Sequence, residues 1–294
     1  MRWILVLALL LGTAGPLWAQ HGGHGGHGGH AASEPDGRGG WTPQPLLIVE
    51  RNEDRASAML RIRGLQAPSV TVFGPGGGHR EFPLTDGRAR IEVADAGTGN
   101  YQWVQIRDEQ AGRVVVASTA WFSPLTGPAP RRLLATPHSE LEIVPALLPR
   151  EHAFYRESEK WGFLVRYQGQ PLAGQPLLLE TENGSRIGLV TDAQGMATVV
   201  FPRDFGDKPD GSGAAGGHVV AGFRGDRIMA GFVLSTEYVS DARHFVTAFN
   251  STYGVDAGRE HSLGWGAAFG VLGMASALPL LRRRKRIVNK EPSC

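Results

Sequence analysis

Short runs of alternating apolar and polar residues fill the middle of the chain, from Trp41 to about residue 240. Clusters rich in Gly, Pro, Asn and Asp separate the runs, which is the pattern of β-strands joined by tight turns. Before the proline-rich segment 123–132, the pattern predicts strands over Leu46–Val49, Ala58–Ile62, Val70–Phe73, Ala89–Val93, Tyr101–Ile106 and Val114–Trp121. After it, the predicted strands are Leu141–Val144, Trp161–Tyr167, Gln175–Thr181, Arg186–Thr191, Ala197–Phe201, His218–Phe223 and Met229–Val239.

Strands at this spacing, without βαβ alternation, predict an all-β fold of two small β-sandwich modules of the Ig-like or transthyretin-like kind. The sequence leaves open whether the two modules share one sheet. The only helix that the pattern indicates is a C-terminal transmembrane helix. The organisation we expect is a signal peptide (1–19), a disordered His/Gly-rich arm (20–40), a first β-sandwich (41–124), a linker (125–133), a transthyretin-like β-sandwich (134–250), a juxtamembrane linker (251–261), the membrane helix (262–281) and a basic tail (282–294).

The two ends of the chain predict export and membrane anchoring. Arg2, the apolar run that follows it and the small residue Ala19 form a secretory signal that would leave Gln20 as the mature N-terminus. Residues 262–281 carry no charge, and at 1.5 Å per residue they reach about 30 Å, the thickness of the hydrocarbon core. Basic residues fill positions 282–286, so the tail is expected in the cytoplasm. The alternative, a buried helix followed by a nucleic-acid patch, fits an uncharged glycine-rich run of this length less well.

This topology predicts a single-pass protein of the cytoplasmic (inner) membrane whose bulk is periplasmic or otherwise extracytoplasmic. Within the membrane helix, four small residues share one face and would let another helix approach, either a transporter subunit or a second copy of the chain. They are Gly266, Gly270, Gly273 and Ala277. Small residues that are merely tolerated in a lone span remain an equal alternative.

Charge and cysteine content narrow the function classes. The whole chain has a formal net charge of +2, but the predicted exported part, residues 20–281, carries about −4, so we expect no nucleic-acid partner. Cys294 is the only cysteine, and the exported modules must be stabilised without an intramolecular disulfide. We find no nucleophile elbow, no phosphate-binding loop and no catalytic cluster, and we therefore expect neither an enzyme nor an organic cofactor.

A histidine repeat directly behind the signal is the strongest candidate for chemistry. His21, His24, His27 and His30 are separated by Gly-Gly pairs. Imidazole suits Ni, Co, Zn and Cu, and glycine lets the backbone fold around an ion. In an extended chain, residues three apart lie about 9 Å from each other, so the spacers must fold back before two rings share a metal. The repeat predicts a flexible, unselective metal collector; a glycine linker with incidental histidines is the alternative.

Other polar residues give weaker signals. The remaining histidines, which lack ligand spacing, are expected to be ordinary partnered or exposed side chains; they are His79, His138, His152, His218, His244 and His261. Asp204, Asp207 and Asp210 could bind Ca²⁺, but their spacing differs from an EF-hand, so a solvated loop is favoured. Asn183 and Asn250 each begin a glycosylation sequon, a motif short enough to occur by chance.

One set of motifs carries a family resemblance. Leu141-Glu142-Ile143-Val144-Pro145, then Gly169-Gln170-Pro171-Leu172-Ala173-Gly174, then Thr191-Asp192-Ala193-Gln194-Gly195 follow in order. This region, about residues 134–240, resembles an exported family of unknown molecular function that is linked to the periplasmic component of nickel/cobalt-type uptake. It is also similar to the transthyretin-like regulatory modules of carboxypeptidases. Members of the exported family carry a histidine at the mature N-terminus followed by aromatic residues. The His-Gly-Gly arm stands in that place, so the family's site is not transferred residue by residue.

We therefore expect a membrane-anchored protein that binds a divalent transition metal as cargo, with nickel or cobalt favoured by the resemblance, and delivers it to an uptake transporter. The alternative is a structural or protein-interaction module of the cell envelope with no metal role.

Overall fold

The computed structural model describes residues 40–95, 99–127, 129–149, 154–205, 218–220, 227–255, 269–272 and 274. All of them belong to one structural unit, which begins at residue 36. The predicted signal peptide, the histidine arm apart from Gly40, and the cytoplasmic tail lie outside the described residues.

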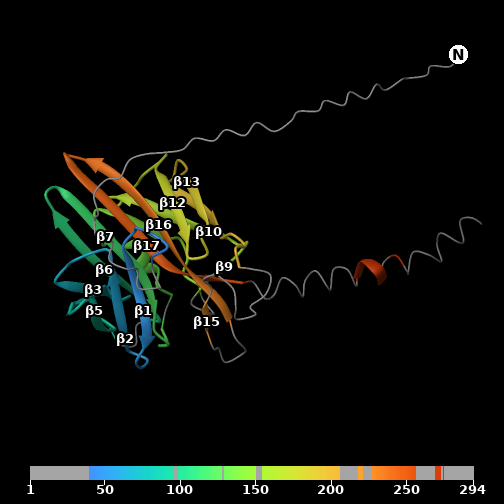
Figure 1. Ribbon diagram of the computed structural model, residues 1–294, viewed down its shortest axis with the longest axis horizontal. Coiled ribbons are helices and arrows are strands. Elements are labelled where there is room, and N and C mark those ends of the chain that lie inside the picture. The colour runs from blue at the N-terminus through green and yellow to red at the C-terminus, as the bar shows by residue number, and fades with distance from the viewer. Residues whose placement is uncertain are drawn as a thin grey trace, which may run out of the picture. The chain divides into compact units, whose positions relative to one another are not determined.

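A ten-stranded sheet forms the centre of this unit (Figure 1). Its main path runs through β13 (Arg186–Val190), β12 (Pro176–Thr181), β16 (Arg227–Ser240), β17 (Arg243–Gly254), β7 (Arg113–Phe122), β6 (Tyr101–Gln110), β3 (Ser69–Phe73) and β4 (His79–Pro83). Two short strands join it at the side, β15 (His218–Val220) next to β16 and β9 (Tyr155–Arg156) next to β17. Neighbours are antiparallel except at β17, which pairs in parallel with β7 and β9.

Two smaller sheets complete the fold. The first contains β1 (Leu46–Asn52), β2 (Ser57–Arg63) and β5 (Arg88–Glu92). The second contains β8 (Leu141–Pro145), β10 (Lys160–Tyr167), β11 (Gln170–Pro171) and β14 (Met196–Val200). We call them the β1 sheet and the β10 sheet.

The two smaller sheets pack on opposite faces of the central sheet. Successive side chains of a strand point to opposite faces, and β6 shows the consequence. Trp103 joins a core that includes Phe163 of β10, whereas its neighbour Val104 joins a separate core that includes Ile91 of β5. The arrangement is therefore two sandwiches that use the two faces of one sheet. The expectation of an all-β fold with β-sandwich packing is confirmed.

Strand β17 is the element that the sequence pattern failed to predict. It begins at Arg243 and ends at Gly254, crossing residue 250, where the second module was expected to end. Phe245 and Phe249 enter the core under the β10 sheet, while Ala248, on the opposite face, packs with Leu46 of β1. β17 is covered on both faces and therefore lacks apolar-polar alternation, and the buried polar residues Thr247 and Asn250 also interrupt the apolar run by which a strand such as β7 was predicted.

The short helix α1 (Arg131–Ala135) was not predicted either, because it has only five residues and begins inside the proline-rich segment. A buried ion pair holds its C-terminal end to the β10 sheet. Arg166 is 2.9 Å from Glu142, and their side chains are 5% and 2% exposed. The same guanidinium donates hydrogen bonds to the carbonyls of the last turn and the residue after it, Leu134, Ala135 and Thr136. A cation at the C-terminal carbonyls of a helix also complements the helix dipole.

Within the predicted membrane segment, the structure describes residues 269–272 and 274, which are helical. Among the described residues, no helix is both long and apolar enough to cross a bilayer.

Candidate functional site

The described chain begins at Gly40, and Trp41, the next residue, packs against the central sheet. A Cβ built on Gly231 of β16 would meet Trp41 Cζ2 and Glu182 Oε2 at 3.4 Å, so both side chains lie over this glycine. The next residue, Thr42, donates a hydrogen bond of 2.8 Å from Oγ1 to Glu180 Oε2. Trp41 and Thr42, which we call the arm root, are therefore held on the central sheet. His21, His24, His27 and His30 lie outside the described residues.

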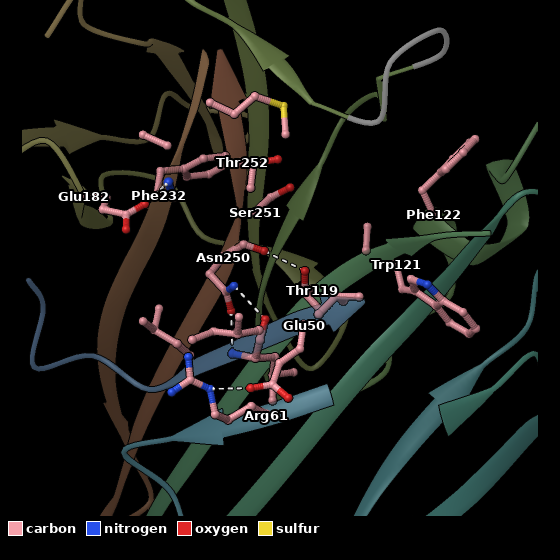
Figure 2. Close-up of a pocket in the computed structure, with 18 of the residues that line it drawn as sticks. Glu50, Arg61, Thr119, Trp121, Phe122, Glu182, Phe232, Asn250, Ser251 and Thr252 are labelled. Carbon is pink, nitrogen blue, oxygen red and sulfur yellow. Dashed lines mark hydrogen bonds and ion pairs between the residues drawn. The ribbon is translucent and has the colours of Figure 1, made fainter. Parts of the chain in front are cut away.

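A cavity of about 530 Å³ lies at this root, where β7 and β17 separate (Figure 2). The parallel pairing of these strands ends at Phe249 and Ser118. Beyond that point Thr119 Oγ1 donates a 2.7 Å hydrogen bond to the Asn250 carbonyl. Strand β1 supplies another wall of the cavity, with Leu46 to Glu50. The volume is in the range of small-ligand sites.

The side chain of Asn250 closes the gap between β17 and β1. Its Oδ1 accepts a hydrogen bond from Leu47 N, and its Nδ2 donates one to Leu47 O, both at 2.9 Å. Figure 2 shows this amide lying against the β1 backbone. Asn250 is 8% exposed. The amide thus acts as a one-residue continuation of the β1 ladder, and it fastens the β1 sheet to the central sheet.

The asparagine side chains of both sequons are hydrogen-bonded within the folded protein. The Asn250 nitrogen is buried and bonded to Leu47 O. The Asn183 nitrogen donates to Tyr253 Oη at 3.2 Å and to Asp204 Oδ1 at 3.3 Å. Both amide nitrogens thus take part in hydrogen bonds within the fold.

Carboxylates line this region. Glu50 is 3.0 Å from Arg61 at one side of the main cavity. At the opposite side, Glu182 Oε2 accepts a 2.8 Å hydrogen bond from Gly231 N. A smaller cavity of about 350 Å³ shares Trp41 and is lined by Glu180, which pairs with Arg186 at 2.6 Å. We call the two cavities together the root groove.

The described histidines outside the arm have ordinary roles. His138 Nε2 lies 2.8 Å from Leu133 O, and its ring packs 4.4 Å from that of Phe73. Burial lowers the pKa of His138, which its contact with the Leu133 carbonyl and the charge of Glu142 only partly oppose. His244, at the surface, pairs with Glu237 at 2.8 Å. These contacts agree with the expectation of partnered histidines.

Asp204, one of three loop carboxylates considered as calcium ligands, is bonded within the fold. It accepts hydrogen bonds from Tyr253 and, at 2.7 Å, from Thr181. Burial raises its pKa, but these bonds outweigh burial, so the net effect lowers it. Asp207 and Asp210 lie outside the described residues. In the part of the chain that the structure describes, His, Cys, Asp and Glu side chains form no group of three suited to a metal ion.

The glycine-rich turn Gly74–Gly78 surrounds a carboxylate of the protein itself. Cβ atoms built on Gly74 and Gly76 would meet Asp95 Oδ2 at 2.7 and 2.8 Å, and one on Gly78 would meet Asp95 Oδ1 at 2.9 Å. Gly78 N also donates to Asp95 Oδ2 at 3.3 Å. A side chain at any of these three glycines would therefore displace the Asp95 carboxylate, which occupies the concave side of the turn.

Sequence reasoning missed the residues that build the root groove. Glu182 follows a predicted strand and resembles any turn residue, and Trp41 marks only the start of the strand pattern. The aromatic and apolar content of residues 245–253 was the available signal for β17, and hence for Asn250. The parallel pairing that gives Asn250 its role depends on β7, about 130 residues earlier in the chain.

No protein-family model matches the chain, and neither does any curated protein. Among solved structures it is similar to a 1.5-MDa bacterial ice-binding adhesin, at 14% identity over 72% of this chain and 65% of that chain, with a TM-score of 0.24. An ice-binding adhesin of an Antarctic bacterium shares 13% identity over 72% and 49% of the two chains (TM-score 0.22). A chimeric titin Z1Z2 shares 12% over 72% and 95% (TM-score 0.19). The chain thus spans less than two thirds of either adhesin chain, and similarities this low carry no argument about function.

Proposed function

We propose that this protein is a membrane-anchored, extracytoplasmic binding and delivery protein for a divalent transition metal, accessory to an uptake transporter. Nickel or cobalt is favoured by the resemblance of residues 134–240 to an exported uptake family. In this proposal the histidine arm collects the metal, the two sandwiches are Ig-like or transthyretin-like modules joined by the central sheet, and residues 262–281 form one transmembrane helix.

The observation that supports the proposal best is the position of the arm root relative to the C-terminal exit. Trp41 lies over Gly231, which pairs with Thr252 of β17. The described body continues only to Val255, three residues beyond Thr252, which is about 10 Å along a strand. Trp41, which follows the arm in the sequence, and Val255, which precedes the apolar C-terminal segment, therefore lie at the same end of the β16–β17 ribbon. A metal collected by the arm would start close to the membrane.

The C-terminal residues have side chains suited to lipid or to a partner helix. Phe269, Val271, Leu272 and Met274 are 63–69% exposed. A Cβ built on Gly270 would meet no atom of the described chain within 4 Å, which leaves room on the small-residue face. Gly266, Gly270, Gly273 and Ala277 would then form the seam against a transporter subunit or a second copy.

The mechanism is capture followed by transfer, without a chemical step. The Gly-Gly spacers bend so that two or more imidazoles coordinate the ion. Because the flexible spacers do not fix the positions of the rings, the ion exchanges readily. Each imidazole must be neutral to coordinate, so affinity falls as the pH drops through about 6.5.

Calorimetric titration of the full chain in detergent tests this function. Ni²⁺, Co²⁺, Zn²⁺ and Cu²⁺ are added to the wild type and to a variant with His21, His24, His27 and His30 replaced by alanine. We expect micromolar binding by the wild type and loss of at least tenfold in affinity in the variant. Binding no tighter than about 1 mM by the wild type, or equal binding by both proteins, would refute the metal function.

A structural or protein-interaction module is the second candidate. Val190 on the outermost strand β13 and Val239 near the β16–β17 turn are 64% and 68% exposed, and they are apolar side chains available to a partner protein. Replacing both with serine separates the candidates. Partner capture would be lost under the interaction function, whereas metal binding would stay unchanged under the metal function.

A further inference from the structure

The two edge strands of the central sheet differ in composition. β4 ends the main path on one side with the sequence HREFP, and β13 ends it on the other with RIGLV (Figure 1). Charged residues and proline on an edge strand hinder the addition of a further strand. β4 contains both, whereas the single charge of β13, Arg186, is paired with Glu180 on the neighbouring strand β12. β13 is therefore the edge that is open to another strand.

The outer edge of β13 carries backbone groups that its ladder with β12 does not use. Directly after β13, Thr191 N donates a hydrogen bond of 3.0 Å to Gln175 O. Bonded and non-bonded pairs alternate along an antiparallel ladder, so positions 187 and 189 also bond to β12. The residues between them direct N–H and C=O away from β12; they are Arg186, Gly188 and Val190. Among the described residues, no backbone hydrogen bond from outside the ladder reaches these three.

The fold of the described chain gives no reason for a glycine at position 188. A Cβ built on Gly188 would meet no atom within 4 Å, and the backbone of this residue is outside the left-handed region that favours glycine. Glycine inside a strand weakens it and often marks a site where another backbone approaches closely. Val190, on the same face of the strand, is an apolar side chain that is 64% exposed. An added strand would explain both features.

We propose that two copies of this chain pair through β13, antiparallel, about a two-fold axis at Gly188. In this register Gly188 faces Gly188 of the second copy, and Arg186 faces Val190. All three residues with outward backbone groups then belong to bonded pairs, and each pair exchanges two hydrogen bonds. Any other antiparallel register leaves at least one of these residues without a partner on β13. Ile187 also lies opposite Leu189 of the second copy, an apolar cross-strand pair, so the edge is complementary to itself.

The pairing would join the two central sheets into one continuous sheet. Because the two-fold axis is perpendicular to that sheet, the β16–β17 ribbons of the two copies run in opposite directions. Val255 of one copy and Val255 of the other then lie at opposite ends of the dimer. For both C-terminal segments to reach the same membrane, the strands must lie along the membrane plane. This pairing does not depend on the proposed metal function.

Cysteine cross-linking of the full chain in detergent tests the register. Gly188→Cys and the matched control Val190→Cys are each made in a Cys294→Ser background, and disulfide-linked dimers are measured on a denaturing gel after mild oxidation. At the two-fold axis the Cα atoms of the two copies are about 5.5 Å apart, which a disulfide can bridge. The two 190 positions are separated by four residues along the strands, about 14 Å, which a disulfide cannot bridge. Unchanged melting temperatures show that both variants fold.

We expect Gly188→Cys to form at least about tenfold more linked dimer than Val190→Cys, a difference that follows from the two distances. Adding Val190→Lys to Gly188→Cys should remove most of the linkage, because the new charge would face Arg186 of the second copy. Val239→Lys, which changes a valine that is 68% exposed and lies outside β13, should leave it intact.

Equal linkage through positions 188 and 190 would overturn the register, since a dimer held only by residues 262–281 would link both variants alike. Absence of linked Gly188→Cys would overturn the pairing, including the case in which a strand of a different protein adds to β13. Neither result affects metal binding, which the calorimetric titration measures separately.

Discussion

The double hydrogen bond between Asn250 and Leu47 predicts a large and localised effect of Asn250→Ala. The substitution removes both 2.9 Å bonds and leaves Leu47 N and O without them in a gap between two sheets. Each buried backbone group that loses its partner costs about 1–3 kcal/mol. We therefore expect the free energy of unfolding to fall by about 2–4 kcal/mol. The loss should be concentrated in the attachment of the β1 sheet.

Urea unfolding, followed by tryptophan fluorescence and circular dichroism, measures the total change. Amide hydrogen exchange of β1 and β2 locates it, since these strands should exchange faster than β10 and β14. Ser251→Ala is the matched control, because Ser251 is the next residue on β17 and lines the same cavity. It should cost less than about 0.5 kcal/mol. A cost for Asn250→Ala within about 1 kcal/mol of this control would refute the role of the amide.

Three further predictions concern the interior. Arg166→Met should cost about 3–5 kcal/mol in thermal unfolding, since it leaves Glu142 buried without its cation; a loss below about 1 kcal/mol would contradict this. Gly76→Ala should destabilise by about 1 kcal/mol, because its Cβ would displace the Asp95 carboxylate and no backbone atom. The cost should shrink in an Asp95→Ala background, and equal costs in both would argue against the clash. Burial lowers the pKa of His138, so the unfolded state takes up a proton at a higher pH than the folded state does. The contribution of neutral His138 to the free energy of unfolding is therefore complete above about pH 6.5 and is lost as the pH falls below it. His138→Gln should flatten this pH dependence of the melting temperature, and an unchanged slope would exclude His138 as its source.

Local pattern was sufficient for the strands that have one exposed face. β2 and β5 alternate buried and exposed positions, and their apolar residues predicted both strands. β17 is buried from Phe245 to Asn250 because sheets cover both of its faces, so it shows no alternation, and its buried polar residues Thr247 and Asn250 leave no continuous apolar run either. The union of the two sandwiches in one sheet depends on the pairing of β17 with β7, a contact between segments far apart in the chain. Whether the modules share a sheet therefore could not be predicted.

The candidate site also has one part that the sequence predicts and one part that depends on contacts between distant segments. The histidine repeat could be found from spacing and residue type alone. Its root could not, because Trp41 lies over Gly231 only after β16 has been placed beside β12 and β17. The glycine-rich turn at residues 74–78 was predicted as a turn. That its concave side holds Asp95 follows from the return of the chain after β5, which the sequence pattern does not encode.

The metal content of the native protein tests the central claim most directly. The full chain without an affinity tag is purified from its own membrane and assayed by elemental analysis. The account predicts that nickel or cobalt copurifies at about one ion per chain or more, and that the metal is lost when the four arm histidines are replaced by alanine. Metal at background level in the wild type, or equal amounts in both proteins, would contradict a metal-delivering arm.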